Sequence, residues 1–288
     1  MTYQSDVAPL RRVLLKHARD AFVSESRIQH QWRELGYLRP PDYLAACRES
    51  DALAALLERL DVDVEWMPPE DAGLDSIYVR DASLLTDRGS VLCAMGKPAR
   101  QDEPAALRRA YRELDIKEHG AIEPPGTLEG GDVAWLTPRA LTVGRGYRTN
   151  REGIDRLAAL LGPTVELIEV PLPHWKGPSD VFHLMSMVSP LAEDLLLVYS
   201  PLLPVPFREL LLQRGFEFVE VPAEEFESMG CNVLALAPRV VIALEGNPET
   251  RRRLMAAGVE VHTYRGDEIS VKGCGGPTCL TRPLERSS

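Results

Sequence analysis

Apolar and polar positions along the chain follow two periodicities, one typical of short strands and one typical of amphipathic helices. From about residue 77 the same order recurs: two strand-like segments, a helix-like segment, and a further strand-like segment. The first strands of these units are predicted to begin near Ile77, Asp132, Val181 and Asn232. This repeat of roughly 50 residues lies in the range of propellers and other arrays.

The two ends of the chain complete a fifth unit. Its first strand is predicted at Thr278–Arg282, its second at Arg11–His17, its helix at Pro41–Leu60 and its last strand at Val62–Met67. A ring closed in this way leaves no exposed sheet edge. The alternative is an open α/β sandwich with coincidental spacing, but the order of the terminal segments favours the ring. We therefore expect an α/β fold, a five-bladed propeller closed by its terminal segments, with residues 1–288 forming a single domain.

A closed ring brings equivalent positions of successive units together. The first strands of a propeller line its central channel, so residues in or beside them are expected to converge. Asp75 and Asp81 are six residues apart, which on a strand places both on the same face. The acidic, imidazole and thiol side chains beside the predicted first strands are Asp75, Asp81, Glu129, Asp132, His183 and Cys279.

The charge balance narrows the class of partner. The chain of 288 residues carries a formal charge of −10 and has a pI near 5.2. Nucleic acids and anionic membranes need clustered Lys and Arg, so neither is an expected partner. A small cationic molecule suits an acidic protein better.

Cysteine usage and hydropathy indicate the compartment. The five cysteines are scattered and form no CxxC pair, which argues against a disulfide scaffold or a structural zinc site. The first six residues lack the order of a signal peptide, and no apolar run approaches the ~18 residues of a membrane span. We therefore expect a cytoplasmic location.

Cys279 is the candidate nucleophile. It follows a Gly-Gly-Pro-Thr turn and opens a short β-type segment, so its thiol is expected to face a cleft; the alternative is an inert core cysteine. Because a free thiol is mostly protonated at neutral pH, it needs an imidazolium or a cationic substrate nearby. His183 is the preferred acid/base because it lies on a predicted first strand, although it is equally compatible with a half-buried structural histidine. His174, in a proline-flanked loop, is its main competitor.

The carboxylates indicate a cationic substrate. Glu129-Gly-Gly-Asp132 is either an ordinary turn or a carboxylate presented beside the thiol. Several carboxylates facing one cavity repel each other and need a cation. Because neither a His/Cys ligand pattern nor an oxygen cage is evident, no metal or cofactor is expected. A guanidinium, which is planar and always charged, matches carboxylates in bidentate fashion.

Five segments together resemble a known family. They are TLEGGDVAWL, LTVGRGYRTN, LDSIYVRD, FHLMS and GGPTCL, dispersed from about residue 74 to 284. In order and spacing they resemble dimethylarginine dimethylaminohydrolase and, more broadly, the guanidino-group-modifying superfamily of arginine deiminases and amidinotransferases. The resemblance implies the pentein fold, a five-bladed αβ propeller, in agreement with the repeat.

The resemblance also implies residue roles. Cys279 matches the nucleophile, His183 the general acid/base, and Glu129 the carboxylate that orients substrate and histidine. A lid is implied around Ala21–Ile28, within a stretch predicted as a loop with at most one short helix. The arginines of the implied substrate site are equally compatible with solvated surface positions. The substrate-binding set is Asp75 and Asp81 for guanidinium nitrogens, Arg100 and Arg148 for an α-carboxylate, and Asp132.

One departure from the family pattern bears on the substrate. Deiminases and amidinotransferases of this superfamily typically carry Asp two residues after the histidine, where it holds an unsubstituted guanidinium nitrogen. Met185 stands there in this chain and favours an N-alkylated guanidinium, whereas Arg80 is a pattern associated with deiminases as well.

These observations predict a hydrolase that converts N-methylated arginine to citrulline and methylamine through a covalent cysteine intermediate. The alternatives are an arginine deiminase or other guanidino hydrolase, an amidinotransferase, or a ring-shaped binding module without turnover. The expected partner is a small cationic guanidino substrate, and a homodimer is left open.

Overall fold

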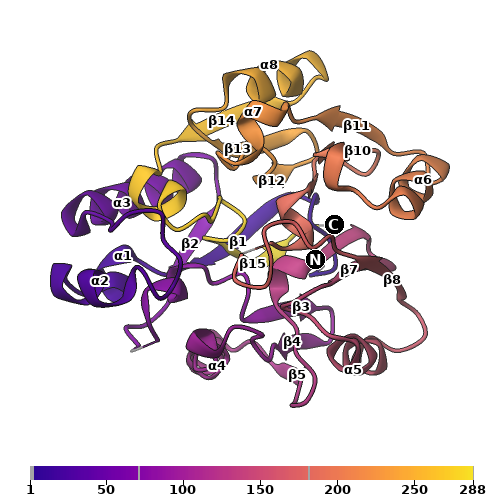
Figure 1. The fold of residues 1–288 in the computed structure, drawn as a ribbon. Helices are drawn as coiled ribbons and strands as arrows, with labels where there is room; N and C mark the ends of the chain where they lie inside the picture. The colour runs from indigo at the N-terminus through magenta and orange to yellow at the C-terminus, as the bar shows by residue number, and fades with distance from the viewer. Residues whose placement is uncertain (1–2, 71, 181, 288) are drawn as a thin grey trace.

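The strands form five three-stranded sheets arranged around a common centre (Figure 1). The structure is a computed structural model that describes residues 3–70, 72–180 and 182–287. In each sheet the first strand runs antiparallel to the second, and the second runs parallel to the third. In chain order the sheets are β3 (Ser83–Thr86), β4 (Gly89–Leu92) and β5 (Glu118–Ala121); β6 (Val133–Thr137), β7 (Ala140–Arg145) and β8 (Glu166–Pro171); β9 (Val188–Pro190), β10 (Leu195–Val198) and β11 (Glu217–Glu220); β12 (Val233–Ala237), β13 (Val240–Leu244) and β14 (Glu260–Tyr264); and β15 (Arg282–Arg286), β1 (Leu10–Leu15) and β2 (Asp63–Trp66).

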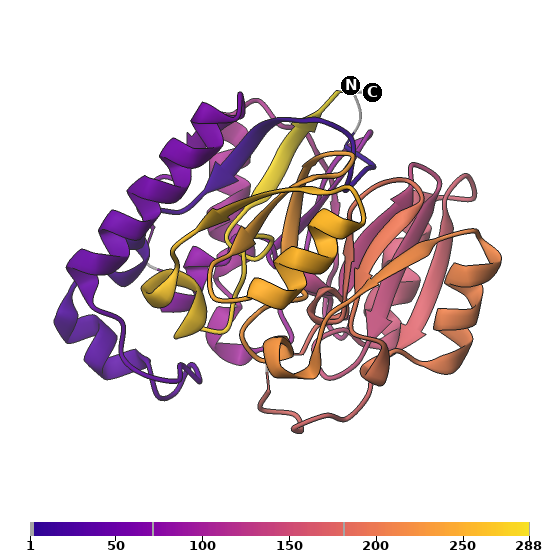
Figure 2. The ribbon, with the colours of Figure 1, turned by 90° about the horizontal axis from the view of Figure 1, so that it is seen from above.

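The chain termini close the ring. β15, from the C-terminal end, pairs antiparallel with β1, and β1 pairs parallel with β2. The backbone N–H of Ser287 donates to the carbonyl of Pro9 at 2.9 Å, so the two ends lie side by side (Figure 2). The predicted five-bladed propeller, including its fifth blade assembled from both ends, is confirmed.

Helices cover the outside of the ring (Figure 1). In α3 the buried positions Ala46, Ser50, Leu53, Ala54 and Leu57 recur at helical spacing and turn one face toward the sheets. No helix among the described residues is long and apolar enough to cross a membrane. The helices are α1 (Ala18–Phe22), α2 (Glu25–Gln31), α3 (Tyr43–Arg59), α4 (Glu103–Glu113), α5 (Arg151–Leu161), α6 (Val205–Gln213), α7 (Ala223–Phe226) and α8 (Pro248–Ala256).

Two of the first strands, β6 and β12, begin within one residue of their predicted starts, whereas β3 and β15 begin later than predicted. Leu74–Ile77 is a 3-10 turn and β3 starts only at Ser83, so Asp75 and Asp81 do not share the face of one strand; that prediction was wrong. In the last blade the predicted strand Thr278–Arg282 is a turn, and β15 begins at Arg282. The predicted start at Val181 lies outside the described residues. A continuous buried apolar run does not distinguish a strand from a buried turn, which explains the misplaced starts.

The stretch predicted as a loop between residues 19 and 39 holds two helices, α1 and α2. The side chain of Ser24 accepts the N–H of Arg27 and so caps α2, and Ile28 is its buried anchor. The implied lid segment Ala21–Ile28 is therefore mostly helical. The chain that follows α2 approaches the centre of the ring instead.

Candidate active site

A cavity of about 300 Å³ opens at the centre of the ring and collects residues from all five blades. Of the predicted site residues, those that line it are Asp75, Asp81, Arg100, Arg148, His183 and Cys279. Leu35, Gly36 and Leu38, from the segment after α2, form part of its wall. The ring therefore brings together residues that are up to 244 positions apart in the chain, Leu35 and Cys279.

Glu129 and His183 form a buried ion pair. Oε2 of Glu129 lies 2.7 Å from Nε2 of His183, and both side chains are nearly inaccessible. The other oxygen of Glu129 accepts the backbone N–H groups of Gly96 (3.0 Å) and Lys97 (3.1 Å). Burial by itself disfavours both charges, but opposite charges outweigh it. His183 lowers the pKa of Glu129, and the carboxylates of Asp81, Asp132 and Glu129 together raise the pKa of His183. At neutral pH the imidazole is therefore positively charged.

The glycines of the Glu-Gly-Gly-Asp motif make room for this pair. A Cβ added to Gly131 would lie 2.5 Å from Nδ1 of His183 and 2.8 Å from Oδ1 of Asp81. Neither neighbour can move far, because the first is held by Glu129 and the second by Arg100. Only glycine fits where the turn passes so close to the imidazole.

Asp132 supports the backbone that carries the histidine. Its Oδ1 accepts the N–H of Leu184 at 3.0 Å, and its Oδ2 accepts the hydroxyl of Thr149 at 2.6 Å. Burial raises the pKa of Asp132 to about 6. The side chain was expected to bind substrate, but both of its oxygens are bonded within the protein, and it does not line the cavity.

Cys279 presents its thiol to the cavity from the turn before β15. Nδ2 of Asn232 donates to Sγ at 3.3 Å, and the hydroxyl of Thr278 lies 4.0 Å from it. Burial, together with the negative charge of Asp81, raises the pKa of Cys279 to about 11. The free enzyme therefore holds a protonated thiol beside an already charged imidazole.

Asn232 is a site residue that the sequence reasoning did not assign. Its Oδ1 accepts the N–H and the hydroxyl of Thr278 (3.1 and 2.7 Å), so the same amide orients the turn and contacts the sulfur. A side chain on Gly276 would collide with it. The signal was its place in the repeat, because Asn232 starts a predicted first strand in the one unit without an assigned polar residue.

Asp81 and Arg100 form the second buried pair. Nη1 of Arg100 lies 2.7 Å from Oδ2 of Asp81, while Oδ1 is buried without a hydrogen-bond partner among the described residues and lies 3.9 Å from Nδ1 of His183. Arg100 also contacts both oxygens of Glu103 at 2.8 Å. Arg100 was expected to bind a substrate carboxylate, but the carboxylates of the protein itself already surround its guanidinium.

Asp75 and Arg148 differ in whether other groups of the protein already occupy their polar atoms. Asp75 was expected to hold a guanidinium nitrogen, yet Nζ of Lys97 lies 2.7 Å from its Oδ2. Arg148 donates to the carbonyl of Asp180 at 3.3 Å and lies 3.7 Å from Glu129, and its Nε has no partner in the described part of the chain. Arg148 therefore keeps a donor for a ligand anion.

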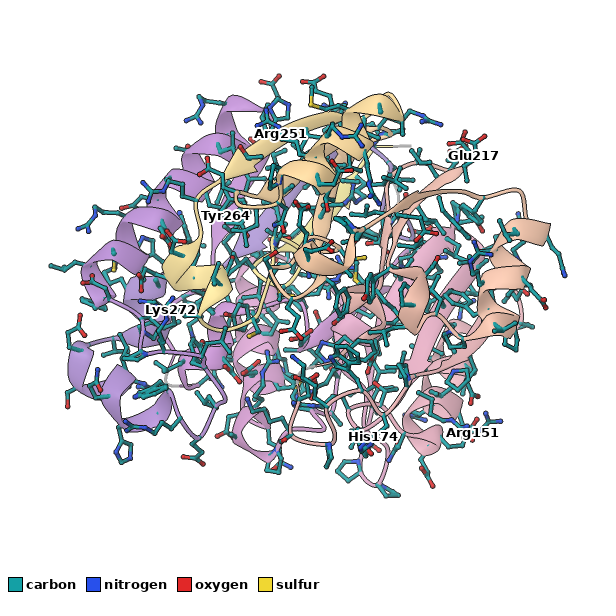
Figure 3. The ribbon with its side chains drawn as sticks, turned by 45° about the horizontal axis from the view of Figure 1, so that its top comes forward. Arg151, His174, Glu217, Arg251, Tyr264 and Lys272 are labelled. Carbon is teal, nitrogen blue, oxygen red and sulfur yellow. The ribbon has the colours of Figure 1, made fainter. Side chains whose placement is uncertain are left out.

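Three residues weighed in the sequence analysis lie away from the cavity lining. Nη2 of Arg80 donates to Asp6 at 2.8 Å, and Met185 is buried at 3% exposure, so the position two after the histidine offers no carboxylate. His174 is exposed, contacts the hydroxyl of Tyr147 at 2.6 Å, and lies near the rim of the molecule (Figure 3). His183 is thus the histidine that shares the cavity with Cys279.

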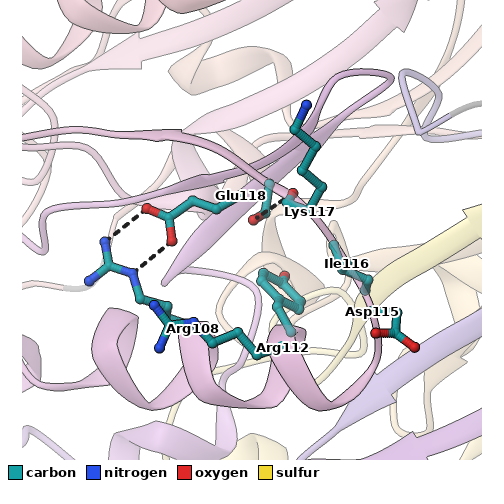
Figure 4. Close-up of a pocket in the computed structure, with 8 residues that line it drawn as sticks. Arg108, Arg112, Asp115, Ile116, Lys117 and Glu118 are labelled. Carbon is teal, nitrogen blue, oxygen red and sulfur yellow. Dashed lines mark hydrogen bonds and ion pairs between the residues drawn. The ribbon is translucent and has the colours of Figure 1, made fainter.

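A separate cavity of about 350 Å³ lies between α4 and β5 (Figure 4). Arg108 and Glu118 pair across it at 2.8 and 3.0 Å. The residues that line it include no thiol and no imidazole, so it lacks the pair of groups that the central cavity brings together.

A metal is a poor fit to the carboxylate and imidazole atoms of the central site. Asp81, Glu129 and His183 place one ligand atom each within 4.8 Å of one another. A metal needs a neutral imidazole, whereas Asp81, Asp132 and Glu129 favour the charged form of His183. The unpartnered oxygen of Asp81, a residue that lines the cavity, instead suits a planar organic cation.

The family of the chain is shown by comparison with known proteins. The arginine deiminase family model matches residues 74–203 and 200–286. The N(G),N(G)-dimethylarginine dimethylaminohydrolase of Streptomyces coelicolor is 30% identical over 266 residues, covering 90% of this chain and 92% of the relative. That of Pseudomonas aeruginosa is 28% identical over 255 residues, covering 85% and 91%.

Solved structures agree. The Pseudomonas aeruginosa enzyme, as a cysteine-to-serine mutant complexed with citrulline, aligns with a TM-score of 0.75 at 25% identity over 95% of this chain and 98% of that chain. The N-terminal domain of the cyanobacterial arginine dihydrolase ArgZ, at 20% identity, shares the fold with a TM-score of 0.81 over 96% and 98%.

The fold and the site define a pentein enzyme that hydrolyses C–N bonds of guanidino compounds. The chain belongs to the arginine deiminase family and resembles its dimethylarginine dimethylaminohydrolase members.

The raised pKa of Cys279 predicts how its alkylation depends on pH. Because the thiolate fraction grows with pH until the pKa is reached, the rate with neutral iodoacetamide should rise about tenfold per pH unit from pH 7 toward pH 10. Cationic chloroacetamidine, which Asp81 attracts, should react much faster at pH 7. Labelling quenched at set times and quantified by mass spectrometry measures both rates. The Cys279→Ser variant separates the signal of Cys279 from that of Cys47 and Cys274. A rate with iodoacetamide that reaches a plateau below pH 8 would contradict the raised pKa.

Substituting Asn232 should weaken the nucleophile. Because Asn232→Ala removes the donor to Sγ, it should raise the pKa of Cys279 further and lower kcat by about 10- to 100-fold, the range for a hydrogen bond to a charged group. The diagnostic readout is the pH profile of chloroacetamidine labelling, which should shift to higher pH. An unshifted profile with lowered kcat would assign Asn232 a role in folding the turn only.

Proposed function

We propose that this chain hydrolyses the guanidinium group of N-methylated arginine to citrulline and a methylamine, through a covalent bond to Cys279. The observation that carries the proposal is the cavity itself: Cys279, His183 and Asp81 line one enclosed space, and Glu129 pairs with His183 from behind the cavity wall. The relatives that act on dimethylarginine support the same substrate class.

The first step follows from the charges in the cavity. His183 is already protonated, so it does not accept the thiol proton. Binding of the cationic guanidinium against Asp81 lowers the pKa of Cys279, and its proton leaves to solvent. The thiolate then attacks the central guanidinium carbon. His183 donates its proton to the methylated nitrogen as the C–N bond breaks, and the neutral methylamine leaves.

The second step returns the enzyme to its starting state. The intermediate is an amidino-thioether cation bonded to Sγ of Cys279. Water attacks its central carbon while the now neutral His183 takes one proton. The C–S bond breaks as the second proton of the water passes to Sγ, so that citrulline, the Cys279 thiol and protonated His183 remain.

Methylated substrates are favoured by what the cavity lacks. Met185 provides no carboxylate at the position two after the histidine, and Oδ2 of Asp81 is taken by Arg100. The unpartnered oxygen of Asp81 therefore holds the guanidinium, and a substituted nitrogen loses no contact. A deiminase acting on free arginine is the second candidate, because a single Asp81 oxygen also binds an unsubstituted NH₂ and arginine deiminases are among the relatives.

A product assay tests the proposal. Purified enzyme is incubated with monomethylarginine, asymmetric dimethylarginine and arginine, and methylamine, dimethylamine, ammonia and citrulline are quantified. Methylamine or dimethylamine in equal amount to citrulline is the expected result. Ammonia from arginine as the main product would assign a deiminase, and amidine transfer to added glycine would assign an amidinotransferase.

A further inference from the structure

Lys97 places a positive charge inside the active-site cavity that the reaction at Cys279 does not use. Its Nζ lies 2.7 Å from Oδ2 of Asp75 and donates to the carbonyl of Leu35 at 2.7 Å. The Lys97 side chain is 15% exposed and that of Asp75 is 8% exposed. All three residues line the cavity. A carboxylate and a carbonyl therefore enclose this ammonium group on the cavity wall.

The chain geometry holds Lys97 in that place. Its backbone N–H donates to Oε1 of Glu129 at 3.1 Å, and Pro98 follows at the start of a 3-10 turn (Pro98–Arg100). Because proline restricts the residue before it to extended backbone, the side chain leaves the catalytic carboxylate in a defined direction. It ends between two elements from other parts of the chain, the segment after α2 and the turn Leu74–Ile77.

The two acceptors around Nζ are those that a free amino group on a substrate would need. An ammonium group has three donors and no acceptor, and burial is costly unless acceptors surround it. In this protein Lys97 uses both Asp75 and Leu35, so a second ammonium group would meet a like charge instead. The same cavity offers the unpartnered Nε of Arg148 to an anion.

We propose that Lys97 is a specificity residue that replaces the amino group of the substrate. The enzyme then accepts N-methylated guanidino acids whose distal amino group is acylated or absent at least as well as methylarginine itself. The inference rests on the proposed function, because it concerns the distal end of a substrate whose guanidinium reacts at Cys279.

The test compares monomethylarginine with its Nα-acetyl derivative as substrates. In the wild-type enzyme the Nα-acetyl derivative should have a kcat/KM equal to or greater than that of monomethylarginine. Lys97→Met leaves Asp75 buried without a cation, so the ammonium group of the substrate gains a partner. The ratio should then shift toward monomethylarginine by at least about tenfold, the size of one hydrogen bond between charged groups.

Two controls isolate the Lys97–Asp75 pair. In Lys97→Met combined with Asp75→Asn the shift should disappear, because no carboxylate is left to receive the ammonium group. Lys176→Met removes the same charge from the cavity mouth, where Lys176 pairs with Glu227 at 2.6 Å, and should leave the ratio unchanged. Thermal unfolding and chloroacetamidine labelling of Cys279 show whether each variant is folded.

The outcomes separate this inference from the proposed function. A wild-type preference of tenfold or more for the free amino group, or an unchanged ratio in Lys97→Met, would overturn the role of Lys97 while leaving the hydrolase intact. If neither methylated substrate is turned over, the proposed function fails. Calorimetric binding of citrulline and Nα-acetylcitrulline to the wild type and Lys97→Met then decides the role of Lys97 by the same ratio.

Discussion

Replacing Cys279 with serine is expected to lower turnover of methylated arginine by at least about 10,000-fold, because a serine hydroxyl in this site has no base to activate it. His183 is already protonated and bonded to Glu129, so it does not accept the hydroxyl proton. Substrate affinity should change little, because Asp81, Glu129 and Arg148 are untouched. Citrulline formation measures the first effect, and calorimetric titration with monomethylarginine measures the second.

Cys274→Ser is the matched control for this substitution. Cys274 lines the same cavity, but its Sγ lies 3.9 Å from the carbonyl of Val271 and has no acid or imidazole as a hydrogen-bond partner among the described residues. Its replacement should leave turnover within about threefold, as for substitutions away from reacting groups. Near-normal activity of Cys279→Ser, or loss of activity only in Cys274→Ser, would contradict the assignment of the nucleophile.

Replacing His183 with asparagine is expected to lower kcat by about 100- to 10,000-fold, the usual contribution of a positioned acid/base. The loss has two causes, because the departing amine lacks a proton donor and the attacking water lacks a base. A substrate with a thiol leaving group, such as S-methylthiocitrulline, needs no proton in the first step. It should therefore still form the covalent adduct in this variant, and the adduct should accumulate as a mass increase on Cys279.

Glu129→Gln tests how the charge of Glu129 affects the protonation of His183. It removes one of the three carboxylate charges that raise the pKa of His183, with Asp81 and Asp132 left in place, and keeps a side chain of similar size. Because the pKa of His183 is then lower than in the wild type, the imidazole loses its charge at a lower pH, and the pH profile of citrulline formation should show kcat falling at lower pH than in the wild type. If His183→Asn hydrolyses the thiol-leaving-group substrate at the wild-type rate, His183 has no role in the second step.

The architecture could be predicted from the sequence because the same order of apolar patterns recurs along the chain. Each blade needs two antiparallel strands, a covering helix and a parallel strand, and each element has its own apolar period. The segments left over at the termini have the element types that a fifth blade needs, in the required order. The pairing of β15 with β1, about 270 positions apart in the chain, could therefore be predicted. Some strand starts were misplaced because buried runs such as Ser76–Val79 have a strand-like sequence pattern but fold as turns.

The pairing of the charged residues was the part of the site that the sequence did not reveal. Asp75, Asp81 and Arg100 were recognised as site residues, but Asp75 faces Lys97 and Asp81 faces Arg100. Such pairing depends on differences of a few ångströms between segments of separate origin. Asn232 was missed for the same reason, since its contact with Cys279 crosses 47 positions.

By itself the sequence determined the ring, the presence of a thiol, an imidazole and acids beside its first strands, and the family to which they belong. These features follow from local periodicity and short motifs, which can be recognised without knowing any distance between residues. Only the tertiary structure decided which charges cancel, that the Cys279 thiol is protonated in the free enzyme, and that Lys97 takes the place beside Asp75. Those properties come from burial and from contacts between blades, because the energy of a charge depends on its neighbours in space rather than in the chain.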